Sequence, residues 1–242
     1  MIVLCGNLTI PYCGRFFHCF YLEERKNCAT ALAGHRAAIL FNRDLQEEKY
    51  MAMNYDITPL EVLEILGAEP SDDFEPIPDA PVLLNDFLSL AFDMELFETA
   101  NIWTDCSDCC FDSECLKIGS DYSTGTIEFG IKKEELNLND PPVYVLFEGD
   151  PAGWKLFSAT LSGFLMYIVC SILCCEDYDT AQDVLKKSNW TYEECSKPKG
   201  IAKTYSFVYG LSVCCGYEPD TNTLLAVLTD RKSKAYRISK EL

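Results

Sequence analysis

The stretch that decides the fold is PPVYVLFEGDPAGWKLFSATLSGFLMYIVCSILCC, residues 141–175. Near its start Val143, Val145 and Phe147 alternate with other side chains, and this period of two predicts a strand. Glycine, aspartate and proline at 149–153 predict a turn, and a short second strand follows at 154–157. The stretch therefore begins as two strands joined by a turn.

A helix is expected after the second strand. Ser158, Thr160 and Ser162 offer side-chain oxygens that can cap its first turn. The apolar residues that follow recur at helical spacing and share one broad face: Phe164, Leu165, Ile168, Val169, Ile172 and Leu173. A single layer of strands would cover such a face. The stretch therefore predicts a sheet with a helix packed across it.

The chain before this stretch predicts two helices separated by an acidic loop. Thr58 can cap a helix that begins at Pro59, because proline is favoured at the first helical position, and Gly67 ends it. Residues 69–81 contain four prolines and five acids, which predicts a loop. A helical pattern resumes at 83–97.

The remaining segments add short helices and strands. Residues 106–126 are polar and rich in turn formers. We expect short helices at 15–24 and 28–42, a strand at 126–131, a short helix or turn at 132–138, a helix at 179–189, and strands at 203–217, 223–229 and 235–239. Helices come first and a mostly antiparallel sheet follows, so we predict a single domain, residues 1–242, of the α+β class.

The charge of the chain is strongly negative and unevenly distributed. The formal net charge is −18, and residues 44–150 hold 26 Asp and Glu against 4 Lys and Arg. Such a field repels nucleic acid and anionic membranes and attracts basic partners. Two interpretations are open: a solvated acidic surface, or a surface that meets a cationic protein.

Whether the 14 cysteines are reduced thiols or disulfides depends on the compartment of the protein. Residues 1–13 lack the basic region of an export signal, and no apolar stretch reaches the roughly 18–20 residues that a membrane span needs. We therefore expect a cytoplasmic, cysteine-rich protein without a membrane partner, whose thiols are reduced and behave mainly as small apolar side chains.

One group of cysteines is the candidate metal site. Cys106, Cys109, Cys110 and Cys115 lie in the segment CSDCCFDSEC, and thiolates this close can converge on one zinc ion. A structural zinc ribbon usually has two separated CxxC pairs, whereas this segment has one, with acidic residues between the thiols. We therefore expect neither a metal nor another cofactor, and keep these four as the candidate ligands.

Catalytic patterns are absent from the sequence. A cysteine nucleophile needs a base within hydrogen-bond reach, and the only histidines are His18 and His35. No GxSxG, HExxH, P-loop or GxGxxG pattern supports another reaction. We therefore predict that the protein is not an enzyme, with a cysteine-dependent enzyme as the third hypothesis. Trp154 follows a Pro-x-Gly turn, and a structural role for its ring is favoured over a binding role.

Several of these segments carry a family resemblance. PVLLNDFL at 81–88 is similar to a helix-opening segment of the SUKH superfamily, and PVY at 142–144 with SATLSGFL at 158–165 is similar to its later strand and helix start. The chain resembles this superfamily of bacterial immunity proteins, a fungal cell-wall assembly regulator and viral relatives over about residues 57–175. Phe92-Asp93-Met94 replaces the usual Asn-Gly after the first helix.

The resemblance implies a curved sheet flanked by helices, with an N-terminal helical segment and a C-terminal β-rich extension outside the SUKH-like core. It also implies a protein that binds and neutralises a protein toxin, and the acidic middle suits a basic one such as a nuclease. The alternative is a regulatory scaffold that binds a host or signalling protein. The candidate partner-binding residues are Asp72, Asp73, Glu75, Asp79, Glu128, Glu134, Glu135, Asp140 and Trp154.

Overall fold

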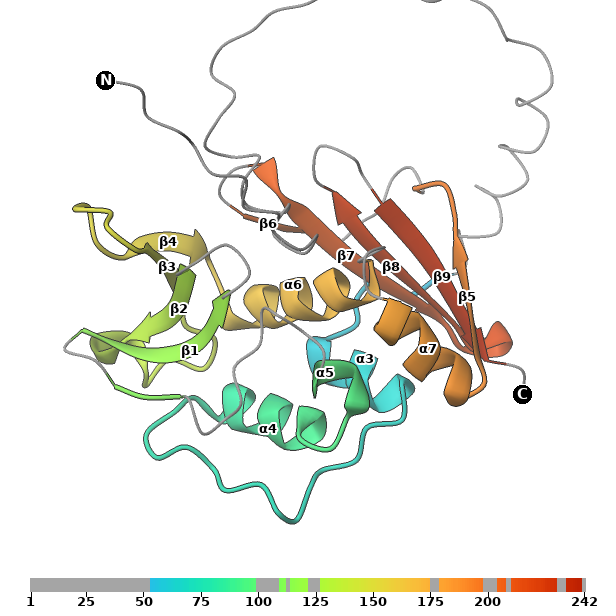
Figure 1. Ribbon diagram of the computed structural model, residues 1–242, viewed down its shortest axis with the longest axis horizontal. Coiled ribbons are helices and arrows are strands. Elements are labelled where there is room, and N and C mark those ends of the chain that lie inside the picture. Colours follow the sequence, from blue (N-terminus) through green and yellow to red (C-terminus); the bar gives the residue numbers. More distant parts are fainter. Residues whose placement is uncertain are drawn as a thin grey trace, which may run out of the picture.

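The computed structural model describes residues 53–98, 109–111, 114–121, 127–174, 179–197, 204–207, 210–229 and 234–240. Two antiparallel sheets lie on either side of a central helix, with further helices packed below it (Figure 1). The α+β class is confirmed. The helices predicted at 15–24 and 28–42 lie outside the described residues, as do His18 and His35.

The helices before the first sheet are α3 (Pro59–Ile65), α4 (Val82–Ala91) and α5 (Glu95–Glu98). Thr58 caps α3 as expected: its hydroxyl accepts from the Glu61 amide at 3.2 Å, and the Glu61 carboxylate accepts from the Thr58 amide at 2.6 Å. Gly67 follows α3 with φ of +97°. The single helix predicted at 83–97 is wrong, because a turn at 92–94, in which the Met94 amide donates to the Ala91 carbonyl, separates α4 from α5.

The first sheet has four strands in sequence order: β1 (Cys115–Asp121), β2 (Ile127–Lys132), β3 (Val143–Phe147) and β4 (Lys155–Ser158). A short 3-10 helix, η2 (Lys133–Glu135), follows β2, and the central helix α6 (Leu161–Leu173) follows β4. Thr160 caps α6, since its hydroxyl accepts from the Gly163 amide at 3.1 Å. Strand β1 lies in a segment from which we expected only turns. Its buried Leu116 and Ile118 are separated by a lysine and followed by Gly and Ser, which hides the strand pattern.

The second sheet has five strands in the order β5-β9-β8-β7-β6. After α7 (Asp179–Lys187) come β5 (Trp190–Glu194), β6 (Tyr205–Ser206), β7 (Ser212–Glu218), a 3-10 helix η4 (Pro219–Thr221), β8 (Thr223–Thr229) and β9 (Lys234–Lys240). The strand predicted at 203–217 is wrong as one element, because Gly210, with φ of +74°, lies in a turn between β6 and β7. Strand β5 was not expected.

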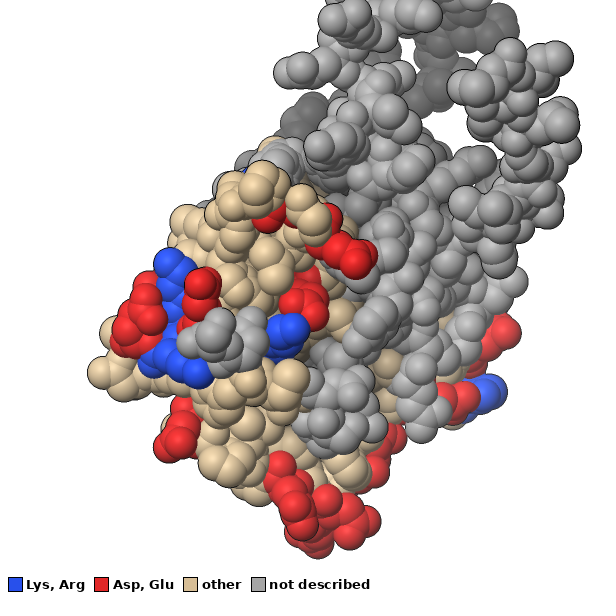
Figure 2. Space-filling view, turned by 60° about the vertical axis from the view of Figure 1, so that its left-hand side comes forward, with Lys and Arg blue, Asp and Glu red and all other residues tan. Residues whose placement is uncertain are grey.

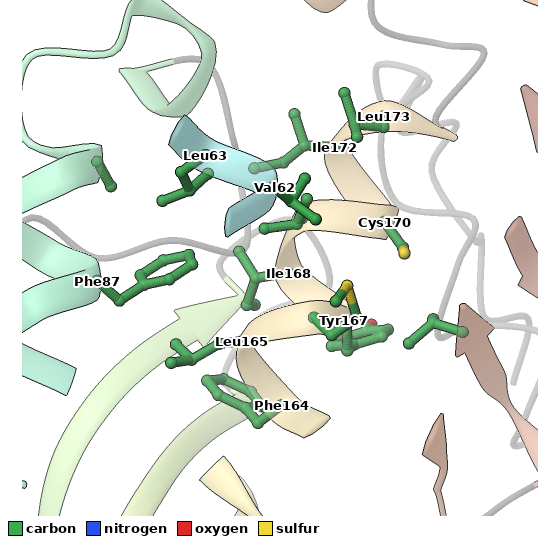
Figure 3. Close-up of a cluster of buried hydrophobic side chains, with 14 of the residues drawn as sticks. Val62, Leu63, Phe87, Phe164, Leu165, Tyr167, Ile168, Cys170, Ile172 and Leu173 are labelled. Atoms are coloured by element: carbon green, nitrogen blue, oxygen red, sulfur yellow. The ribbon is translucent and has the colours of Figure 1, made fainter. Parts of the chain in front are cut away.

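The central helix α6 explains why two sheets are present. Twelve of its thirteen residues are buried, and nearly all of these are apolar, so the helix is covered on every side. Leu165 and Ile168 point toward α4, while Tyr167 and Cys170 point toward the five-stranded sheet (Figure 3). One face covered by a single strand layer, as the spacing suggested, is therefore an incomplete description of this helix.

One apolar cluster links these parts. It runs from Val62 on α3 through α6 to Leu224 and Ile238 in the five-stranded sheet. At one end of α6, a ring of the four-stranded sheet meets a ring beside the five-stranded sheet: the ring centroids of Phe157 on β4 and of Phe207, directly after β6, are 5.3 Å apart. The two sheets and the helices therefore share one core rather than packing as separate bodies. Among the described residues, no helix is long and apolar enough to cross a membrane.

Candidate partner-binding surface

The loop between α3 and α4, residues 69–81, is held against α4 and is called the acidic loop below. The Ser71 amide donates to the Ser89 carbonyl at 3.1 Å. Asn85 makes two bonds to one loop residue: its Oδ1 accepts from the Ile77 amide at 2.9 Å, and its Nδ2 donates to the Ile77 carbonyl at 3.2 Å. Phe74 is buried, with its ring 6.0 Å from that of Phe92 in an edge-on arrangement. The loop is therefore fixed at several points along the helix.

The four carboxylates expected in this loop all face outward. Asp72, Asp73, Glu75 and Asp79 are exposed, and within the described part of the chain their carboxylates have no hydrogen-bond or ion-pair partner. The residues between them, such as Phe74, supply the inward anchors. This alternation leaves four unneutralised charges on a backbone that is already ordered.

The segment that carries the acidic loop contains no cation of its own, and a cation that meets it from elsewhere is Lys187 of α7, which binds Glu95 of α5 at 2.6 Å. Residues 53–98, which form α3, the loop, α4 and α5, contain 12 Asp and Glu and no Lys, Arg or His. Figure 2 shows acidic side chains gathered at the lower end of one face, at the level where Figure 1 places α4 and the loop, with no basic side chain among them. Charges of one sign on an exposed surface produce a potential that attracts cations.

Two other expected residues, Glu128 on β2 and Trp154 just before β4, lie at the four-stranded sheet. Phe129 packs against α6, so its neighbours Glu128 and Gly130 point to the opposite, outer face of the sheet. Glu128 is bound there by Lys117 at 2.6 Å. Trp154 lies over Gly130, since a Cβ atom at Gly130 would come within 3.0 Å of its Cη2. The Trp154 ring fills the space that a side chain at Gly130 would occupy, and this supports a structural role for Trp154.

Glu135 and Asp140 also have partners within the chain. The Tyr144 hydroxyl donates to Glu135 at 3.1 Å, and burial, together with this bond, raises the pKa of Tyr144 above its ordinary value. Asp140 accepts from both the amide and the hydroxyl of Ser162 at 2.7 Å, and so holds the first turn of α6. Glu134 is exposed in η2. The structure thus divides the expected site: the carboxylates of the acidic loop are free of such bonds, while Glu128, Glu135 and Asp140 are bound by partners within the fold.

The cysteines kept as candidate metal ligands do not gather into a site within the described residues. Cys106 lies outside them, and no group of three or more His, Cys, Asp or Glu among the described residues has metal-binding geometry. Cys110 is exposed and Cys115 is buried.

A different pair of thiols meets between α6 and β7, where Cys170 and Cys215 have their sulfur atoms 3.4 Å apart. The hydrogen bond to Cys170 and burial raise the pKa of Cys215 well above the ordinary value, so its thiolate is disfavoured. The pair is far apart in sequence, and no local pattern could reveal it.

Comparisons with family models, curated proteins and solved structures returned no significant match. The resemblance to the SUKH superfamily therefore stays a prediction that rests on the segments quoted above. The class that the structure defines is an α+β protein with two antiparallel sheets around a buried helix.

Proposed function

We propose that this protein is an immunity-type binding protein that neutralises a cognate basic protein toxin, such as a nuclease, in the cytoplasm. The observation that supports it most directly is the acidic loop: four exposed carboxylates on an anchored backbone, in a unit without a single cation. A nuclease must be basic where it holds nucleic acid, so its active-site surface is complementary in sign to this loop.

The anchoring of the loop favours binding over mere solvation. A surface that is ordered before it meets its partner loses less conformational entropy on association, so more of the contact energy appears as affinity. Complementary charge also raises the association rate and disfavours wrong partners. Both effects suit a protein that must capture a toxin before the toxin acts.

The test is co-expression with the product of the neighbouring gene. An immunity protein restores growth of cells that produce that product, and it co-purifies with it. A variant with Asp72→Asn, Asp73→Asn, Glu75→Gln and Asp79→Asn should protect less well at equal expression. Toxicity that persists with the intact protein present, or the absence of a complex, contradicts the proposal. A complex without any change in toxicity points instead to a regulatory scaffold.

A further inference from the structure

We propose that α4 and the acidic loop form one docking surface for a cationic protein, in which Val82 and Phe92 are the apolar contacts and the carboxylates form the rim. This inference rests on the proposed function and specifies where and how the partner is held.

The outward face of α4 provides the first step. Val82, Asp86 and Ser89 recur at spacings of four and three, so they share one side of the helix, and the exposed Asp93 lies in the turn that follows it. The opposite side is buried against the core through residues such as Phe87. The bonds from Ser71 to Ser89 and from Ile77 to Asn85 bring the acidic loop to the border of this outward face. The helix face and the loop are therefore one continuous surface.

The exposure of Val82 provides the second step. Its side chain is 74% exposed, whereas the other exposed large apolar side chains of the described residues, Phe92, Phe111, Leu138 and Leu156, range from 41% to 47%. Val82 therefore contributes little to the core. Phe92 lies at the other end of α4 and contacts Phe74 of the loop through the edge of its ring. Apolar side chains within a polar rim are the usual anatomy of a protein interface.

The negative charge of the surface favours a cationic partner. Every ionisable residue of 53–98, apart from tyrosine, is an acid, so a protein that covers Val82 must present Lys or Arg around an apolar recess. Nucleic acid and anionic membranes are repelled by the same field. A second copy of this chain placed on the same patch would bring like charges together across a two-fold axis. A cationic protein is the occupant that the surface fits.

The loop carboxylates and the apolar residue Val82 have different roles in binding. Exposed charges act mainly on the association rate, through long-range attraction, and apolar contacts act mainly on the dissociation rate. Replacing the four loop carboxylates should therefore slow association, while Val82→Ala should speed dissociation about fivefold or more. Because Val82 is so exposed, Val82→Ala should leave folding intact, and Leu138→Ala, at 47% exposure, is the matched control.

The experiment places a photoreactive benzoylphenylalanine at position 82, 138 or 156 of the full chain and uses the purified product of the neighbouring gene as the probe. Positions 138 and 156 are exposed sites near or on the four-stranded sheet, so they report on the other candidate surface. We expect cross-linking to the probe from position 82 and not from the other two, and the kinetic pattern given above for Val82→Ala.

Each other outcome contradicts the inference. Cross-linking from 138 or 156 but not from 82 would place the partner on the four-stranded sheet and leave the proposed function standing. Cross-linking of position 82 to a second copy of the chain would make the surface a dimer interface. Failure of the intact, unlabelled protein to bind the probe at all would overturn the proposed function, and this inference with it.

Discussion

Replacing Asn85 with alanine should release the acidic loop from α4 without unfolding the protein. Asn85 makes the two hydrogen bonds, at 2.9 and 3.2 Å, that hold Ile77 of the loop. A typical intramolecular hydrogen bond contributes about 0.5–1.5 kcal/mol, so the loss of both should lower the free energy of local opening by about 1–3 kcal/mol. That change corresponds to an increase of roughly fivefold to 160-fold in the opening equilibrium.

Hydrogen–deuterium exchange is the suitable assay, because the Ile77 amide is itself the donor in one of the lost bonds and exchanges only when the loop opens. Alanine is also a better helix former than asparagine by up to about 0.7 kcal/mol, so the overall melting temperature should change little. Asp86→Ala is the matched control: it makes a similar change on the same helix, at an exposed residue whose side chain has no partner among the described residues. Equal exchange of Ile77 in the native protein and in Asn85→Ala would refute the claim that Asn85 orders the loop.

Three further predictions concern the rest of the fold. Thr160→Ala should lower the free energy of unfolding by about 1 kcal/mol in denaturant titrations, because it removes the cap of α6, whereas Thr160→Ser should keep most of it. Since the folded-state pKa of Tyr144 is raised above 10.0, its contribution to stability is present below that pH and is lost as the pH rises through the folded-state pKa. Glu135→Gln should bring that pKa, measured by NMR, closer to 10.0, and an unchanged value would contradict the assigned partner. In the native protein a thiol reagent should label Cys110 well before Cys215, and rapid labelling of Cys215 would contradict its burial.

Local signals in the sequence predict the elements whose ends are determined by nearby residues. The cap at Thr58 and the stop at Gly67 delimit α3 because both act within one turn of the helix. The acidic loop was predictable for the same reason, since its prolines and acids exclude a helix or strand. The strands β1 and β5 were missed because their neighbours in space, not their own patterns, stabilise them.

The environment of α6 could not be predicted from its spacing. The residues on its second side, such as Tyr167 and Cys170, are apolar enough to be buried but do not by themselves require a second sheet. Only the pairing of β8 with β7 on one side and β9 on the other, far along the chain, provides the layer that covers them. Burial on every side of a helix is a tertiary property, and a hydrophobic stripe shows only part of it.

The candidate site was predictable as a set of charges but not as a set of roles. Composition located the acidic residues, yet Asp140 is held by Ser162, 22 residues away, and Glu128 by Lys117, 11 residues away. Partners this far apart in the sequence produce no local pattern from which the contact could be predicted. The free carboxylates of the acidic loop could be separated from the engaged ones only with the structure available.

The central claim is that the acidic loop recognises a cationic protein, and the most direct test is the salt dependence of association with the product of the neighbouring gene. The loop variant (Asp72→Asn, Asp73→Asn, Glu75→Gln and Asp79→Asn) is compared with a control that neutralises four exposed carboxylates elsewhere, at Asp183, Glu193, Glu194 and Asp220. The two variants have the same net charge, so a difference between them does not come from net charge.

We predict that the loop variant associates about tenfold or more slowly than the native protein at low ionic strength, and that the difference shrinks as salt is added. The control should associate nearly as fast as the native protein. Equal rates for the two variants, or a loop variant whose association rate and salt dependence match those of the native protein, would contradict the claim that this loop is where the partner is recognised.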